Sequence, residues 1–434
     1  MHSSTLNHLS LPIDPTRLPL PVRLARRLVF ARLERLTGGR IILRDDDGEH
    51  SFGDPTGGPT ATVTVQRPRF YRRVVLGGDL GAADAWIDGD FTCDHLVDLL
   101  AVFVRSIDQA HALTGGAARV RTAIDRVRHW LNRNTRTGSR RNIAAHYDLG
   151  NDFFRLFLDE SMTYSCGIFE HPDTSLADAQ FAKLDLVCRK LRLTPDTHLL
   201  ETGTGWGSLA LHAARHYGCR VTTTTISREQ HRLACERVAD AGLDDRITCL
   251  LTDYRDLDGT FDRIASIEMI EAVGLDHLSG YFRACRERLA DDGMMLAQVI
   301  TTDHRFHDRY RRSVDFIRRD VFPGSHCPSL PTLLAASEGE TDLAAVHVEN
   351  IGPHYAHTLH RWRDNFHATR EQARQLGATD SFLRLWDYYL AYCEAGYRER
   401  YLGNVQVLWA PPACRVDDPT PTAPRAPQPE GASG

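Results

Sequence analysis

The sequence predicts a doubly wound α/β sheet of mainly parallel strands, preceded by a smaller α+β domain. From residue 142 onward, apolar strand-like runs alternate with helical segments, which is typical of parallel strands joined by crossover helices. Earlier in the chain, strand-like runs follow one another across short turns, which favours a separate domain. The boundaries that we predict are 1–114 for the small domain, 115–141 for a linker, 142–410 for the large domain and 411–434 for a tail.

The small domain is predicted to begin with a helix and to continue with strands. The helix is indicated by leucines at helical spacing, namely Leu24, Leu28, Leu33 and Leu36. RIILRDDDGEHSF then contains a strand, an Asp-Gly turn and a second strand, and TATVTV alternates as a third. After Pro68, apolar segments around glycine turns and the run LVDLLAVFV favour further helices.

The predicted linker and tail differ sharply in composition from the two domains. Between Gly115 and His146 the only acid is Asp125, against the arginines Arg119, Arg121, Arg126, Arg128, Arg133, Arg136, Arg140 and Arg141. Such a run is most often solvated, and it is also suited to anionic lipid headgroups. The tail is rich in proline, alanine and glycine, so we expect it to be disordered.

Composition narrows the classes of function. The formal net charge of −5 gives no general attraction to nucleic acid. The ten cysteines are scattered singly without a C-x-x-C pair, so neither a disulfide framework nor a metal site is expected. With no secretory signal, we expect a cytoplasmic protein. No window reaches the roughly 18 apolar residues of a spanning helix, so we expect any membrane contact to be peripheral.

The large domain is predicted to contain five strands and two helices in the order of the α/β pattern. The strands are HLLETG (198–203), CRVTTTTIS (219–227), RITCLLTD (246–253), FDRIASIEM (261–269) and GMMLAQVIT (293–301). The helices are WGSLALHAARHYG (206–218) and REQHRLACERVADAG (228–242).

A glycine-rich loop joins the first of these strands to the first helix, and three ligand classes use such a loop. A nucleoside triphosphate needs a lysine and a hydroxyl after the last glycine, and both are missing after Gly207. A dinucleotide needs a third glycine where Ser208 stands and an acid after the second strand. The remaining pattern is Glu201-x-Gly203-x-Gly205-x-Gly207. Its acid suits a ligand with an ammonium group and no phosphate, and S-adenosylmethionine (SAM) fits best.

Residues after the following strands support a SAM site. Asp253 and Tyr254 stand where an adenine needs a polar partner and a flat neighbour, at the carboxyl ends of the strands. Gln230 could hydrogen-bond the ribose. Taken alone, each is more simply interpreted as an ordinary surface loop residue.

Several motifs together resemble the bacterial cyclopropane fatty acid synthases, relatives of the mycolic acid cyclopropane synthases. They are AAHYDLGNDFF, MTYSC, LLETGTGWGSLA, TTTTISREQ, DYRDL, FDRIASIEMIEAVG, FPG with PSL, and IGPHYAHTL. The resemblance runs from about Arg140 to about Leu408. LGGDLGAADAWIDGDF in the small domain resembles the lipid-binding domain of longer members that act on phospholipids.

The resemblance implies a class I SAM-dependent methyltransferase fold and methylation of a double bond in an unsaturated phospholipid acyl chain, closing a cyclopropane ring. It also implies bicarbonate as the bound base. Its holders, carried over by motif, are Cys166 and Ile300 through backbone groups and Glu271 and Tyr355 through side chains, with Gln298 where the family has histidine. The SAM site carried over by motif comprises Tyr164, Ser165, Gly203, Gly205, Thr225, Gln230, Tyr254 and Ile267.

The chain departs from the family at three of these positions. Glu201 replaces an aspartate and Thr204 a cysteine, and both changes leave SAM binding plausible. Gln298 is more consequential, because an amide donates to an anion but carries no charge and takes no proton near neutral pH. A branch of the family carries this glutamine, and some members make methylene or methyl-branched acids. A hydride shift before deprotonation would give such a methylene product, so both products stay open.

Other interpretations of the sequence also remain open. A methyltransferase for a soluble metabolite would work without vesicles and without Glu271. A lipid-binding module that has lost turnover is motivated by Gln298. Cys166 has no base beside it in sequence, so a small buried thiol is the simpler interpretation. Glu271 lies in an apolar run where a carboxylate needs a partner, and its neighbour Glu268 could face the SAM side instead. A homodimer is one possible assembly, and no nucleic-acid partner is expected.

Overall fold

The computed structural model describes residues 19–54, 56–107, 150–416 and 420–427. The chain divides into two compact units, Met1–Arg121 and Thr122–Gly434, and each is described by itself. The basic linker predicted at 115–141 lies outside the described residues.

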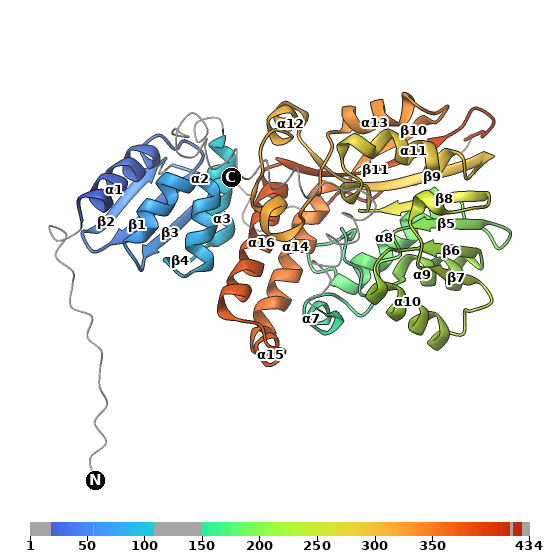
Figure 1. Ribbon diagram of the computed structural model, residues 1–434, viewed down its shortest axis with the longest axis horizontal. Coiled ribbons are helices and arrows are strands. Elements are labelled where there is room, and N and C mark those ends of the chain that lie inside the picture. The colour runs from blue at the N-terminus through green and yellow to red at the C-terminus, as the bar shows by residue number, and fades with distance from the viewer. Residues whose placement is uncertain (1–18, 55, 108–149, 417–419, 428–434) are drawn as a thin grey trace, which may run out of the picture. The chain divides into compact units, whose positions relative to one another are not determined.

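The first unit contains a four-stranded mixed sheet with helices packed against it (Figure 1). The strand order is β2-β1-β3-β4, and β1 pairs antiparallel with β2 but parallel with β3. The helix and the three strands predicted at the start of this unit are present. The elements are α1 (Leu20–Leu33), β1 (Arg40–Asp45), β2 (Gly48–Gly53), β3 (Thr60–Val65), α2 (Arg69–Ile87), β4 (Phe91–Cys93) and α3 (Leu96–Arg105).

Helix α1 does not use all its leucines for packing. Its buried side chains are Val22, Ala25, Val29 and Leu33. Leu20, Leu24 and Leu28 are instead 67%, 52% and 51% exposed, so they form an outward stripe with the helical spacing of four residues. The rotation of the helix is held by Arg26, which donates to Asp45 at 2.7 Å. Periodicity predicted the helix correctly but could not show which side faces the sheet.

The second unit is a doubly wound α/β sheet, as predicted (Figure 1). Its strand order is β10-β11-β9-β8-β5-β6-β7. The five strands from β5 to β9 pair in parallel, and β10 and β11 are antiparallel additions at one edge. The strands are β5 (His198–Thr202), β6 (Arg220–Thr224), β7 (Ile247–Leu250), β8 (Phe261–Ile267), β9 (Leu289–Thr302), β10 (Ala344–Asn350) and β11 (Leu402–Ala410).

Helices cover both faces of this sheet, and α14 and α16 lie side by side at one end of it (Figure 1). The α-helices are α7 (Asn151–Arg155), α8 (Leu176–Lys190), α9 (Ser208–Tyr217), α10 (Arg228–Asp240), α11 (Leu278–Arg286), α12 (His304–Tyr310), α13 (Leu330–Glu338), α14 (Gly352–Ala368), α15 (Arg370–Gln375) and α16 (Asp380–Arg398). Short 3-10 turns are η2 (Tyr254–Asp256), η3 (Ile270–Ala272) and η4 (Leu275–His277), and η5 (Ile317–Val321) is a π-helical turn.

Two apolar clusters fill the two faces of the sheet because successive strand residues point in opposite directions. Leu199 belongs to the cluster that also holds Ala213 of α9. The next residue, Leu200, belongs to the opposite cluster with Phe282 of α11. Strand β5 is therefore buried on both faces, which explains its continuous apolar sequence. It lies between β6 and β8, where the direction of strand order reverses, the place at which open α/β sheets bind ligands.

Part of the tail differs from the expected disorder. Residues 420–427 contact α14 and the end of β10 through backbone groups. His354 Nε2 lies 3.1 Å from the Pro424 carbonyl oxygen, His357 Nε2 lies 2.9 Å from that of Pro427, and the Ala423 amide donates to Glu349 at 2.8 Å. Proline has no N–H but keeps its carbonyl acceptor, so a proline-rich segment can still be held by imidazole donors.

Among the described residues, no helix is long and apolar enough to span a bilayer. The same residues contain no group of three or more histidine, cysteine or acidic side chains placed to hold a metal ion.

Candidate active site

The glycine loop after β5 has the backbone that the sequence pattern requires. Gly203, Gly205 and Gly207 have φ values of +98°, +53° and +88°, a left-handed region that favours glycine. A Cβ at Gly203 would also lie 3.0 Å from Met269 Cγ, so a larger residue would crowd the turn after β8. The loop therefore presents bare backbone to the space above the sheet, and Gly207 starts helix α9.

A cavity of about 310 Å³ lies above this loop. All but one of the predicted cofactor residues line it, namely Tyr164, Ser165, Glu201, Gly203, Gly205, Thr225, Gln230, Asp253, Tyr254 and Ile267, and the exception is Gly207. Of the predicted catalytic residues, Glu271, Ile300 and Tyr355 also line it. Cys166 and Gln298 lie behind the cavity wall, fully buried. The two predicted sites therefore open into one space.

Glu201 and Lys183 are two buried ionisable residues, an acid and a base, that both line the cavity. Glu201 accepts a hydrogen bond of 2.6 Å from the Thr223 hydroxyl, and burial raises its pKa to about 8. Lys183, from α8, donates to Ser165 Oγ at 3.0 Å, and burial lowers its pKa to about 8. Sequence reasoning missed Lys183, because it lies within a helix and carries no motif. An amino acid portion of a ligand would meet a carboxyl and an amine here.

The predicted adenine and ribose contacts are already engaged with neighbouring side chains. Both carboxylate oxygens of Asp253 accept from the guanidinium of Arg255, at 2.6 and 2.8 Å. An adenine would have to share this carboxylate with Arg255. Gln230 accepts from the Thr225 hydroxyl at 3.0 Å. Tyr254 lines the cavity with its ring packed edge-on against Tyr281, at 5.1 Å between centroids. Tyr254 thus supplies the flat neighbour that the sequence predicts.

The opposite end of the cavity is walled by aromatic side chains. The Tyr355 and Tyr397 rings lie 4.5 Å apart, and the Tyr164 and Tyr389 hydroxyls lie 2.8 Å apart. Further rings lining this end are Tyr310, Phe322, Tyr392 and Tyr401. These residues come from the chain between α7 and α8, from the end of α12 and the segment that follows it, and from α14, α16 and the residues just after α16. Aromatic faces in a water-poor space attract a cation through the ring quadrupole.

Glu268 is the centre of the hydrogen bonds at this site. Its Oε1 accepts from the Cys166 amide at 3.0 Å, from Gln298 Nε2 at 2.9 Å and from Asn404 Nδ2 at 2.6 Å. Its Oε2 accepts from the Tyr355 hydroxyl at 2.7 Å. Burial and the neighbouring Glu268 charge raise the pKa of Tyr355 well above its usual value, so this hydroxyl remains a donor. All four donors are uncharged.

A chain of side chains behind the cavity orients Gln298. Lys190 Nζ donates to Gln406 Oε1 at 2.7 Å, and Gln406 Nε2 donates to Gln298 Oε1 at 2.9 Å. Lys190 is also ion-paired with Glu349. Because the oxygen of each amide is occupied, Gln298 must present its nitrogen to Glu268.

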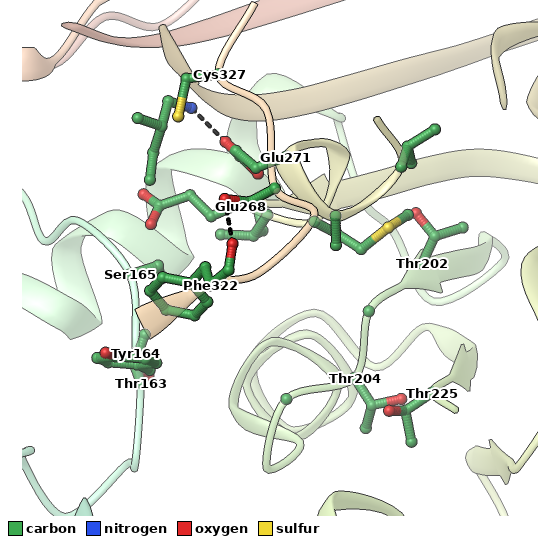
Figure 2. Close-up of a pocket in the computed structure, with 18 of the residues that line it drawn as sticks. Thr163, Tyr164, Ser165, Thr202, Thr204, Thr225, Glu268, Glu271, Phe322 and Cys327 are labelled. Carbon is green, nitrogen blue, oxygen red and sulfur yellow. Dashed lines mark hydrogen bonds between the residues drawn. The ribbon is translucent and has the colours of Figure 1, made fainter. Parts of the chain in front are cut away.

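Glu271 lies three residues after Glu268, in the short turn η3, and its environment is different. Its Oε1 accepts from the Ile300 amide at 2.5 Å, whereas its buried Oε2 has no hydrogen-bond partner. Burial, with the charge of Glu268 adding to it, raises the pKa of Glu271 to about 8. Figure 2 shows both glutamates in the same part of the pocket, with Thr204 and Thr225 of the loop side in another part.

The structure thus brings together all five predicted anion holders but divides them between two carboxyl groups. The Cys166 amide, Gln298 and Tyr355 meet at Glu268, and the Ile300 amide meets Glu271. Sequence reasoning did not identify Glu268 as this meeting point, nor the supporting Asn404 and Gln406. The available signal was the pair of acids three residues apart at the end of an apolar strand.

Comparisons with known proteins identify the family. A family model described as mycolic acid cyclopropane synthetase matches residues 134–407. The chain belongs to this family. The general reaction of the chain can therefore be inferred from members of this family.

Three similar proteins illustrate the range of the family. The tuberculostearic acid methyltransferase of Mycobacterium tuberculosis is 36% identical over 92% of this chain and 96% of the relative. The cyclopropane-fatty-acyl-phospholipid synthase of Escherichia coli is 33% identical over 82% of this chain and 89% of its own. A crystal structure of a mycolic acid cyclopropane synthase complexed with SAH (S-adenosylhomocysteine) and CTAB is 33% identical, with a TM-score of 0.59 over 62% of this chain and 97% of that one.

The family and the cavity together establish a SAM-dependent methyltransferase that acts on lipids. The predicted fold class is confirmed for the second unit, and the predicted methyl donor is SAM. The residues present fit that donor, because the loop at Gly203 leaves no room for a side chain and a buried carboxyl and amine lie beside it.

Proposed function

We propose that the protein methylates the double bond of an unsaturated phospholipid acyl chain and closes a cyclopropane ring on it. The observation that carries the proposal is that the glycine loop and the two glutamates open into one cavity with aromatic walls. A donor site alone would suit any methyl acceptor. The aromatic end adds what a very weak nucleophile such as an olefin needs, a dry space for the cation formed on it.

The residues divide the work by position. SAM supplies an electrophilic methyl group when bound. Glu201 and Lys183 are placed to hold the ammonium and carboxylate of its amino acid portion, and the loop from Gly203 to Gly207 allows close approach. Tyr164, Tyr355 and their neighbouring rings shelter the positive charge on the acyl chain from water. A base then has to remove one proton from the added carbon.

A membrane substrate is supported by the first unit. The exposed leucines of α1 alternate with the exposed Arg23 and Arg27. Apolar side chains flanked by arginines suit the boundary between acyl chains and anionic headgroups. We therefore propose that the protein works at the cytoplasmic face of a membrane, bound peripherally through this stripe.

A second product, an exocyclic methylene or methyl-branched acyl chain, is favoured by one observation. Gln298 replaces the histidine usual in the family, and one relative, matched over 92% of this chain, is a tuberculostearic acid methyltransferase. The cyclopropane and the methylene product share the methyl transfer and differ only in whether a hydride moves before the proton leaves. A saturated methyl branch would need a separate two-electron reduction of the methylene product.

The test uses the purified full chain, SAM and vesicles of a monounsaturated phospholipid. We expect SAH to form and each modified acyl chain to gain the mass of one CH2 group. Proton NMR of the extracted lipids then distinguishes cyclopropane from vinylidene hydrogens, and Gln298→His is compared for a change in their ratio. The proposal fails if SAH does not form and the acyl masses are unchanged. Methylation of soluble amines or phenols without vesicles would favour the metabolite enzyme instead.

A further inference from the structure

We propose that Glu268 is the base of the reaction, and that its carboxylate occupies the anion position for which bicarbonate is expected. This inference rests on the proposed methylation of a double bond and names the group that ends it. The protein would then need no external anion.

The first support is that the donors expected to hold an external anion are already used. The Cys166 amide, Gln298 and Tyr355 all donate to Glu268, with distances between 2.7 and 3.0 Å. Asn404 adds a fourth donor at 2.6 Å. A bicarbonate beside Glu268 would have to share these donors and would place a second negative charge in the same buried space. Like charges in such a site repel strongly, so the Glu268 carboxylate alone is expected to occupy these donors.

The second support is that the four donors belong to four separate parts of the chain. They are the segment before α8, strand β9, helix α14 and strand β11. Among the described residues, no arginine or lysine forms a direct ion pair with Glu268, and the four donors are neutral dipoles that fix the carboxylate. The buried Lys183 amine acts on Glu268 only through longer-range charge.

The third support is the backbone at Glu268. Its φ of +50° is left-handed, which is uncommon and strained for a residue other than glycine. The Glu268 amide donates to the Gln298 carbonyl at 2.8 Å, which holds this conformation. The strained turn lies directly after β8 and places the side chain on the cavity wall, among residues that also line the cofactor end. Strain of this kind is found where a side chain must be held in one place.

The fourth support is the contrast with Glu271. Glu271 has a partnerless buried oxygen and a pKa raised to about 8, so it carries its own proton at neutral pH and cannot accept another. Two neighbouring carboxyl groups with such different surroundings separate into one proton acceptor and one neutral acid. The four hydrogen bonds assign the acceptor to Glu268.

The step balances without a further reactant. The π electrons of the olefin form a bond to the methyl carbon while its bond to sulfur breaks, which leaves a cation on the neighbouring chain carbon. A C–H bond of the added methyl then breaks, its electron pair closes the ring, and its proton goes to a Glu268 oxygen. A proton next to a carbocation is strongly acidic, so even a well hydrogen-bonded carboxylate accepts it. The same donors make the carboxylate a poor nucleophile toward the methyl donor.

The test compares wild type, Glu268→Gln and Glu268→Ala in buffer freed of carbon dioxide and with added sodium bicarbonate. We expect wild-type turnover to change less than twofold between the two buffers. Glu268→Gln should lose at least about 100-fold in both, the usual scale of a lost general base. Glu268→Ala leaves the four donors without the carboxylate. Added bicarbonate or formate should therefore raise the turnover of this variant at least about tenfold and reach a plateau as the anion concentration increases.

Anion binding gives a readout that needs no turnover. NMR of 13C-labelled bicarbonate should show binding to Glu268→Ala and none to wild type. Calorimetric SAH binding and the melting temperature show whether each variant is folded, and Glu340→Gln, an exposed glutamate paired with Arg283, is the matched control.

Three outcomes would overturn the proposal. They are wild-type turnover that falls in carbon dioxide-free buffer and returns with bicarbonate, near wild-type turnover of Glu268→Gln, and absence of anion binding by folded Glu268→Ala. If wild type methylates no unsaturated lipid at all, the proposed function fails, but the NMR comparison still decides whether Glu268 fills an anion cradle.

Discussion

The Gln298 amide nitrogen lies 2.9 Å from Glu268 Oε1, and its oxygen accepts from Gln406 Nε2 at the same distance. The amide therefore has one orientation, fixed from behind by Gln406 and Lys190. The sequence alone shows Gln298 only as a replacement for a histidine. In the structure Gln298 is the last donor in a series of hydrogen bonds that runs from Lys190 through Gln406 to the Glu268 carboxylate.

Reversing the direction of the hydrogen bond between Gln406 and Gln298 should impair catalysis more than removing that bond. Gln406→Leu removes the donor to Gln298, and we expect a fall in kcat of about tenfold with little change in KM. Gln406→Glu keeps the shape and the contact to Lys190 but offers only acceptors, so Gln298 must turn its oxygen toward Glu268. We expect a larger loss from this isosteric change. A simple packing role would give the opposite order, and steady-state kinetics with melting temperatures as controls separates the two.

Cofactor binding should be linked to a proton at Glu201. This carboxyl, with its pKa raised to about 8, is protonated in the free protein at neutral pH, whereas binding an ammonium group favours the ionised form. The dissociation constant of SAH should therefore fall as pH rises toward 8, by up to about tenfold per pH unit.

Calorimetry in buffers of different ionisation enthalpy measures the released proton directly. Glu201→Gln should flatten the pH dependence. A wild-type affinity that does not change between pH 6 and pH 8 would contradict this assignment of Glu201.

Stability should depend on pH through Glu271. Its folded-state pKa of about 8 lies above its ordinary value, so the folded chain holds a proton that the unfolded chain releases. That contribution is complete at acidic pH and is lost as pH rises through 8, with a slope of at most about 1.4 kcal/mol per pH unit. Glu271→Gln should remove it, so the variant gains stability relative to wild type between pH 5 and pH 8. Urea unfolding at several pH values tests this, with Glu340→Gln as a control that should track wild type.

Membrane binding should depend on the outward stripe of α1. Replacing Leu24 and Leu28 with glutamine keeps helix propensity and removes two exposed apolar side chains. We expect the affinity for anionic phospholipid vesicles to fall at least about tenfold, from the lost apolar burial. Leu376→Gln, which is similarly exposed in the second unit, should bind vesicles as wild type does. Equal binding by all three proteins in a sedimentation assay would show that α1 does not face the membrane.

Much of the fold and the cofactor loop follows from local patterns. Alternating apolar strands and helices predicted the doubly wound sheet because each strand of a parallel sheet is buried on both faces. The loop was equally readable, since Glu201 and the glycines at 203, 205 and 207 are neighbours in the chain. Their spacing alone encodes a turn with left-handed backbone and an acid beside it.

The α1 helix shows where local patterns are insufficient. Leucine spacing predicted a helix, but helical periodicity leaves the inward direction undefined when apolar residues occur on more than one side. Burial of the opposite face, through Val22, Ala25 and Val29, leaves Leu24 and Leu28 facing outward, and the contact between Arg26 and Asp45 agrees with this rotation.

By itself, then, the sequence determined the sheet, the glycine loop, the family and the residue types available for chemistry. Only the tertiary structure decided which carboxyl group those residues serve. Cys166, Gln298, Tyr355 and Asn404 lie far apart in the chain and converge on Glu268, a residue held at φ +50°. The physical reason is that hydrogen bonds depend on distance and direction between elements, and packing of strands β8, β9 and β11 against α14 sets those distances.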